Sequence, residues 1–276
     1  MGVILLGVDF SASPTPAKPI TVAHACWVKD RARPAVRIER LEALARLDDF
    51  EILLSRPGPW VGGFDFPFGL PRELVQAMNW PQHWPDLIQT FSACPRPVLR
   101  ERFRAFCAAR PVGGKFAHRA TDRWAGSSPS MKWVNPPVAW MLHAGAPRLM
   151  KAGVHIPGLF EGDRGRVALE AYPGFVARSI TRDSYKSDDR ARQNESRAQA
   201  RLTIIRALAA GDHALGVRVC FARAVREQLD HDPRGDWLDA VLCAVQAGWA
   251  QACGPGWGLP PDVDPLEGWI VGAKPC

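Results

Sequence analysis

Two short, continuously apolar stretches that each run into an aspartate place the strongest constraint on this sequence. Residues 4–10 are Ile-Leu-Leu-Gly-Val-Asp-Phe and residues 60–66 are Trp-Val-Gly-Gly-Phe-Asp-Phe, a pattern typical of strands buried on both faces of a sheet. Asp9 and Asp65 therefore fall at the strand ends. Because a buried carboxylate is costly unless it is paired, hydrogen-bonded or bound to a cation, these acids constrain the site as well as the fold.

The segments between these stretches predict how the strands are connected. Residues 20–28, and then Val36, Ile38 and Leu41, alternate as half-buried strands do, so the first three strands are expected to form an antiparallel meander. Residues 47–56 have the apolar spacing of a crossover helix, which would make strand 60–66 parallel to the first strand. The two aspartates would then lie at matching strand ends.

The remainder of the chain predicts an insertion followed by further elements of the same domain. Residues from about 71 to 158 are rich in Pro and Trp, with short helices at 100–109 and 139–144, and are interpreted as an insertion in a single domain spanning residues 1–276. A strand is expected at 166–172, with Glu170 near its end. Helices are expected at 187–210, at 215–229 and at about 233–253, the last with Asp232 as cap and Pro233 in its first turn.

Composition narrows the class of protein. The seven cysteines, Cys276 among them, include no C-x-x-C pair, which argues against a disulfide framework or a zinc cluster. An amino terminus without a basic flank and the lack of about 18 consecutive apolar residues predict no signal peptide and no membrane span, so a cytoplasmic location is expected. The net charge of +7 favours polyanionic partners, although many Arg-rich proteins bind no nucleic acid.

A second pair of acids opens the last predicted helix. Asp236 and Asp239 are three residues apart and share a face of an otherwise apolar segment. A structural role is open for some of these acids: Asp9 would cap the turn at Ser11–Ser13, and Asp236 would complement the helix dipole. Asp9 and Asp65 on neighbouring strand ends, however, would repel each other without a cation between them, which favours a metal site.

The candidate acids and the residues around them together resemble a known superfamily. Asp9 on the first strand, Asp65 on the fourth and Asp-x-x-Asp-Ala on the last helix resemble the ribonuclease H-like superfamily, particularly bacterial Holliday-junction resolvases. More narrowly, the sequence is similar to domain-of-unknown-function family 429, described as predicted nucleases. The blocks that carry this resemblance are Gly-Val-Asp-Phe-Ser at 7–11, Phe-Asp-Phe-Pro-Phe-Gly-Leu-Pro at 64–71, Leu-Glu-Ala-Tyr-Pro-Gly at 169–174 and Asp-Trp-Leu-Asp-Ala-Val-Leu-Cys-Ala at 236–244.

The resemblance implies a fold and a set of catalytic residues. The implied fold is α/β: a ribonuclease H-like mixed five-stranded sheet, with antiparallel first three strands and then parallel strands, flanked by helices and carrying the helical and loop insertion. Asp9, Asp65 and Asp239 match metal-ligand positions, Asp236 matches an accessory acid, and Glu170 matches the smaller family only. Carboxylate oxygens suit Mg²⁺ or Mn²⁺, and two such ions hydrolyse phosphodiesters in many nucleases.

Basic and aromatic residues supply candidate substrate contacts. In the insertion, Lys115, Arg119, Arg123 and Lys132 alternate with aromatic residues such as Trp133, a pattern that suits phosphates and stacked bases. A solvated loop whose Trp side chains cover the core is the structural alternative. Ser11, beside Asp9, and Lys186 complete the candidate set, whereas the arginines at 190, 197 and 201 fit a solvated, salt-bridged helix face better than a phosphate-binding stripe.

The sequence leaves alternative functions open. The leading hypothesis is a metal-dependent nuclease or related phosphodiesterase acting on nucleic acid. The alternative is a non-catalytic protein that keeps the fold and binds a nucleic acid or nucleotide. Sugar kinases and actin-like ATPases share the core fold and also begin with Gly-x-Asp, but Ser-Ala-Ser-Pro at 11–14 replaces the Gly-rich phosphate turn that they need.

Overall fold

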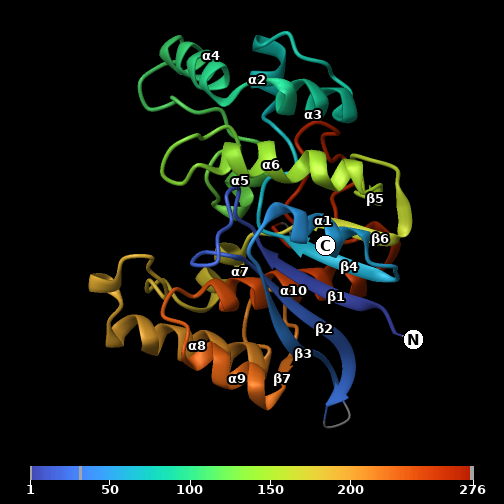
Figure 1. Ribbon diagram of the computed structural model, residues 1–276, viewed down its shortest axis with the longest axis vertical. Coiled ribbons are helices and arrows are strands. Elements are labelled where there is room, and N and C mark those ends of the chain that lie inside the picture. The colour runs from blue at the N-terminus through green and yellow to red at the C-terminus, as the bar shows by residue number, and fades with distance from the viewer. Residues whose placement is uncertain (1, 31–32, 274–276) are drawn as a thin grey trace.

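A seven-stranded mixed sheet flanked by helices forms the centre of the computed structural model, which describes residues 2–30 and 33–273 (Figure 1). The strands lie in the order β5-β6-β4-β1-β2-β3-β7. Their bounds are β1 (Ile4–Asp9), β2 (Ile20–Asp30), β3 (Arg33–Leu44), β4 (Trp60–Phe64), β5 (Val154–His155), β6 (Asp163–Glu170) and β7 (Val219–Phe221). Cys276 lies outside the described residues.

The strand directions agree with the expected meander, but the strand count does not agree with the sequence prediction. β1 pairs antiparallel with β2 and β2 with β3, while β4 runs parallel to β1 and β6 parallel to β4. The prediction of a five-stranded sheet is wrong, because β5 adds an edge beside β6 and β7 adds the other edge beside β3. Strands of two or three residues are too short to show a period in sequence.

The helices surround this sheet, and several begin where the sequence did not indicate. Residues 215–229 hold β7 and a short helix rather than one helix, and the helix predicted at 187–210 begins only at Glu195, where the Asn194 side chain caps it. The last helix begins at Asp236 rather than near Pro233. The helices are α1 (Leu47–Ser55), α2 (Arg72–Ala77), α3 (Trp84–Ala93), α4 (Arg96–Ala108), α5 (Ala120–Ala125), α6 (Val138–Lys151), α7 (Pro173–Ile180), α8 (Glu195–Ala210), α9 (Arg223–Asp230) and α10 (Asp236–Ala252), with 3-10 turns η1 (Arg190–Arg192) and η2 (Gly254–Gly256).

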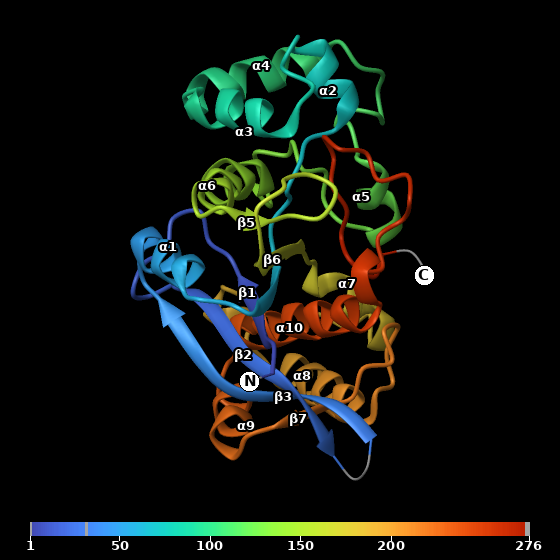
Figure 2. The same cartoon turned by 90° about the vertical axis from the view of Figure 1, so that its right-hand side faces the viewer.

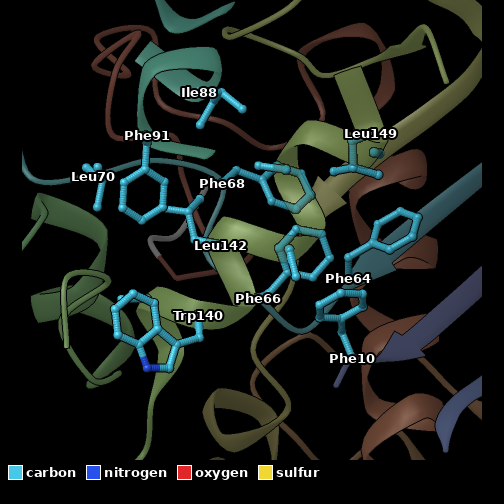
Figure 3. Close-up of a cluster of buried hydrophobic side chains, with 14 of the residues drawn as sticks. Phe10, Phe64, Phe66, Phe68, Leu70, Ile88, Phe91, Trp140, Leu142 and Leu149 are labelled. Atoms are coloured by element: carbon cyan, nitrogen blue, oxygen red, sulfur yellow. The ribbon is translucent and has the colours of Figure 1, made fainter. Parts of the chain in front are cut away.

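The period of two along β1 divides its side chains between two cores. Leu6 and Val8 belong to a cluster that includes α1 and the insertion helices, whereas Leu5 belongs to a second cluster with α10. In the first cluster the Phe10 and Phe66 rings lie 4.7 Å apart, and Figure 3 shows them beside side chains of the insertion. The insertion therefore shares a buried core with the sheet.

Paired glycines allow α10 to lie directly on the strands. Gly7 of β1 and Gly63 of β4 are partners in the parallel register. A Cβ atom on Gly7 would lie 1.9 Å from the carbonyl oxygen of Ala240, and a Cβ atom on Gly63 would lie 2.4 Å from that of Cys243. Because only glycine permits this approach, the helix backbone packs against the strand backbones, and its first turn lies beside the ends of β1 and β4.

The molecule is extended along one axis. Helices α2, α3 and α4 of the insertion lie at one end, and α8 and α9 lie at the opposite end, in both views (Figures 1 and 2). The sheet and α10 lie between them. The candidate acids therefore fall in the middle of the molecule, where the insertion, the sheet and the carboxyl-terminal helices meet.

Candidate functional site

Asp9 and Asp65 lie side by side at the ends of two parallel strands. Asp9 ends β1, and Asp65 directly follows β4, where its backbone N–H donates to the Val8 carbonyl at 2.8 Å. By the alternation of side chains along a strand, both residues share the sheet face of the paired glycines, which α10 covers. Their carboxyl groups are joined by a hydrogen bond.

Asp239 adds a third carboxylate from the first turn of α10. Its side chain is completely buried, with the Tyr185 hydroxyl donating to Oδ1 at 2.5 Å and the Lys186 ammonium bound to Oδ2. The Lys186 side chain keeps 43 % of its surface exposed. Lys186 also attracts the charges of Asp9 and Asp65, so the three predicted aspartates gather around one lysine.

Burial and repulsion between like charges raise the pKa values of Asp9, Asp65 and Asp236. Burial raises the pKa of Asp9 well above its ordinary value, and the negative charge of Asp239 raises it further. Burial also raises the pKa of Asp65 to about 7, although Lys186 opposes the shift. Burial, with repulsion from Asp232, raises the pKa of Asp236 to about 6.

Helix α8 fixes the loop that carries Lys186. The buried Arg201 guanidinium donates to the Tyr185 carbonyl at 2.9 Å, and Arg197 donates to the Ser184 carbonyl at 3.4 Å. These arginines hold the loop between α7 and α8 against the sheet, a role that the helix-face pattern did not predict. The sequence pattern predicted Lys186 as a site residue. It gave no signal that the hydroxyl of Tyr185 would bind Asp239.

Glu170 and Arg119 form a separate buried ion pair. Arg119 is 1 % exposed and donates to both Glu170 oxygens, at 2.8 and 2.6 Å, and to Asp122 Oδ1 at 2.8 Å. Glu170 also accepts the Phe68 N–H at 2.9 Å. The Arg119 guanidinium is thus occupied by carboxylates rather than presented to a phosphate, and the pair ties α5 of the insertion to the end of β6.

Two cavities meet at the acids. The first has a volume of about 470 Å³ and the second of about 710 Å³, and Asp65 and Lys186 line both. Asp9, Asp236 and Ser11 line the second cavity, while Glu170 and Arg119 line the first. The acids therefore lie between two hollows, each of a size that suits a small ligand or one residue of a polymer.

The other candidate residues of the insertion lie elsewhere. Lys115, Arg123, Lys132 and Trp133 are not among the described residues that line either cavity. Trp133 is buried, with its ring 5.4 Å from that of Phe116, so it covers the core as the structural alternative held. Basic residues that sequence reasoning missed line the cavities instead, namely Lys18, Arg96, Arg178, Arg182 and Arg234.

The donor set suits a hard divalent cation only in part. Asp9 and Asp65 supply carboxylate oxygens, the ligands that Mg²⁺ and Mn²⁺ prefer. Both oxygens of Asp239, however, are bound by Tyr185 and Lys186. In the part of the chain that the structure describes, no set of three or more His, Cys, Asp or Glu side chains is grouped closely enough to hold a metal ion as it stands.

The fold and the site define an α/β protein with a buried acidic cluster where the ends of two parallel strands meet the first turn of a helix. No family model, curated protein or solved structure matches the chain. Across residues 2–30 and 33–273, every helix is too short or too polar to cross a membrane.

Proposed function

We propose that the chain is a metal-dependent phosphodiester hydrolase, a nuclease of the ribonuclease H-like superfamily and of family 429. The observation that carries the proposal is the convergence of Asp9, Asp65 and Asp239 around the single cation of Lys186. Burial is the main cause of the raised pKa values of Asp9 and Asp65, and the charge of Asp239 adds to it. A divalent cation between these two residues would favour their ionised forms.

The sheet topology supports the proposed superfamily. The central strands lie in the order β3-β2-β1-β4-β6, with an antiparallel meander first and parallel strands after it. This is the arrangement that the superfamily resemblance implies. β5 and β7 extend its edges without changing the order at the site, where β1 and β4 are adjacent.

Asp9 and Asp65 are the residues that would hold the cation, with Asp236 nearby on the wall of the second cavity. When bound, Mg²⁺ or Mn²⁺ would activate water and offset charge on the phosphate. Lys186 contributes a fixed ammonium that faces both cavities and attracts a phosphate. A second ion at Asp239 would have to displace Lys186, so the proposed two-ion chemistry requires that ion pair to open.

The test is hydrolysis of bis(p-nitrophenyl) phosphate by purified protein with Mn²⁺ or Mg²⁺. We expect a metal-dependent rate that Asp9→Asn abolishes and that Asp48→Asn, an exposed acid of α1, leaves unchanged. Equal residual rates in wild type and Asp9→Asn would show that a contaminating enzyme is responsible. They would remove the support for hydrolase activity.

A non-catalytic nucleic-acid- or nucleotide-binding protein is the second candidate. The specific observation in its favour is the Lys186–Asp239 ion pair, which supplies a cation to the most buried acid without any metal. Calorimetric titration with Mn²⁺ separates the candidates. Tight binding that is lost in Asp65→Asn supports the hydrolase, whereas oligonucleotide binding without Mn²⁺ binding supports the second candidate.

A further inference from the structure

The two cavities differ in lining and meet at the acids. Asp65 and Lys186 line both, so the acidic cluster lies at the junction of two hollows rather than at the bottom of one. The substituents on the two sides of a phosphodiester leave its phosphorus in different directions. A phosphate monoester has only one such substituent, so it would occupy only one of the two cavities.

The first cavity is built for a flat, partly apolar group. Its walls include Phe66, Val138, Met141 and Tyr172, with Ser127 and Ser128 as polar groups. Its volume of about 470 Å³ lies within the range of about 300–1,000 Å³ that small-ligand pockets occupy. Arg178 is held beside the Tyr172 ring, 5.1 Å from its centre, by hydrogen bonds to the Tyr172 hydroxyl and the Ala125 carbonyl. The Arg178 guanidinium lies over the Tyr172 ring, and a flat cation stacked on an aromatic ring suits a nucleobase.

The second cavity is larger, and its lining carries four basic and four acidic side chains. Its volume is about 710 Å³, and Lys18, Arg96 and Arg234 line it. Arg96 lies over the Trp140 ring, 5.6 Å from its centre. The Lys18 ammonium forms an exposed ion pair with Asp188 at 2.6 Å. It is therefore paired outside the acidic cluster. Cations along the wall of this cavity suit a sugar–phosphate backbone.

We propose that the substrate is a single-stranded nucleic acid that lies across the acidic cluster, with one nucleobase in the first cavity and its backbone continuing through the second. A base that enters the first cavity must be unpaired, so a duplex without frayed or extruded bases does not fit. This inference rests on the proposed hydrolase function for its central phosphodiester. Binding of the strand, however, is measured separately from its cleavage.

The test is fluorescence anisotropy of labelled oligonucleotides of one sequence, single-stranded and as a blunt duplex, with protein carrying Asp9→Asn. We expect the single strand to bind more tightly than the duplex. Thr181→Trp fills the first cavity from its rim and should weaken single-strand binding about tenfold, the order of one lost base contact. Thr203→Trp, on an exposed face of α8, is the matched control and should bind as the parent does.

The outcomes distinguish this inference from the proposed function. Equal affinity for single strand and duplex, or equal affinity in Thr181→Trp and its control, would overturn the single-strand assignment. The proposed hydrolase function, tested with bis(p-nitrophenyl) phosphate, would be unaffected by that result. Single-strand binding that Thr181→Trp weakens, in a protein that hydrolyses no diester, would instead sustain the binding inference and reject the hydrolase.

Discussion

The Lys186 ammonium is bound to Asp239, a carboxylate that is completely buried in the first turn of α10. The lysine comes from a loop and the aspartate from a helix that lies on the sheet. The pair joins these elements at the point where two cavities meet. The contribution of this ion pair to protein stability and the charge balance around it lead to separate predictions.

Lys186→Met should destabilise the protein by leaving the Asp239 carboxylate buried beside Asp9 and Asp65 without its cation. We expect a loss of about 1–3 kcal/mol in the free energy of unfolding, less than the about 3–5 kcal/mol of a fully buried pair, because 43 % of the Lys186 side chain is exposed to water. Urea unfolding at pH 7 measures it. Lys151→Met, which removes an exposed ion pair with Glu51, should change little, and equal effects in both variants would contradict the prediction.

Adding Asp239→Asn to Lys186→Met should restore part of the lost stability, because no unpaired charge is then buried. The double-mutant cycle should therefore give a favourable coupling energy between the two residues. If the two losses simply add, the pair contributes no coupling and the lysine acts through its packing alone.

Metal-free protein should lose stability as pH rises from about 4 to about 7, because folded Asp65 keeps its proton to about 7 while unfolded Asp65 ionises near its ordinary value. Above that range this contribution is constant. Asp65→Asn should flatten the profile and raise the free energy of unfolding at pH 8 by at most about 4 kcal/mol, since one pKa unit corresponds to about 1.4 kcal/mol. Chemical unfolding in EDTA at several pH values, with Asp48→Asn as control, measures both effects. A profile that is unchanged in Asp65→Asn would refute the assignment.

Gly7→Ala should separate α10 from the sheet, since the added Cβ would overlap the Ala240 carbonyl oxygen. Overpacking of this kind costs about 1–3 kcal/mol or more. Mn²⁺ affinity should fall as well, because the displaced helix carries Asp236, which lines the second cavity with Asp9. Thermal unfolding and calorimetry test the variant against Gly2→Ala, whose Cβ would contact nothing within 4 Å. Wild-type stability in Gly7→Ala would show that the helix adjusts freely.

Arg119→Met should destabilise the protein by about 3–5 kcal/mol, because it leaves the buried carboxylates of Glu170 and Asp122 without their shared cation. Mn²⁺ affinity of the folded protein should change little, since Asp9 and Asp65 remain. A selective loss of Mn²⁺ binding at unchanged stability would instead assign Glu170 to the metal site. Denaturant unfolding and Mn²⁺ titration of the same sample distinguish the outcomes.

Residues 4–9 and 60–64 were predictable as strands because continuous burial leaves an apolar run that ends at the acid. The meander and the parallel β4 followed from strand periodicity and from the crossover helix. β7 was missed because three residues show no period, and α8 was placed too early because the capping by Asn194 is a local hydrogen bond that charge pattern does not reveal.

The local pattern of apolar residues was enough to place Asp9 and Asp65 at strand ends and Asp239 near the start of a helix. What surrounds these acids depends on tertiary packing. Lys186 reaches Asp239 from 53 residues earlier in the chain, and Arg119 is drawn to Glu170 across 51 residues. Contacts at such separations depend on how whole elements pack, so the pairing of Lys186 with Asp239 and the other basic residues that line the cavities have no signature in local sequence.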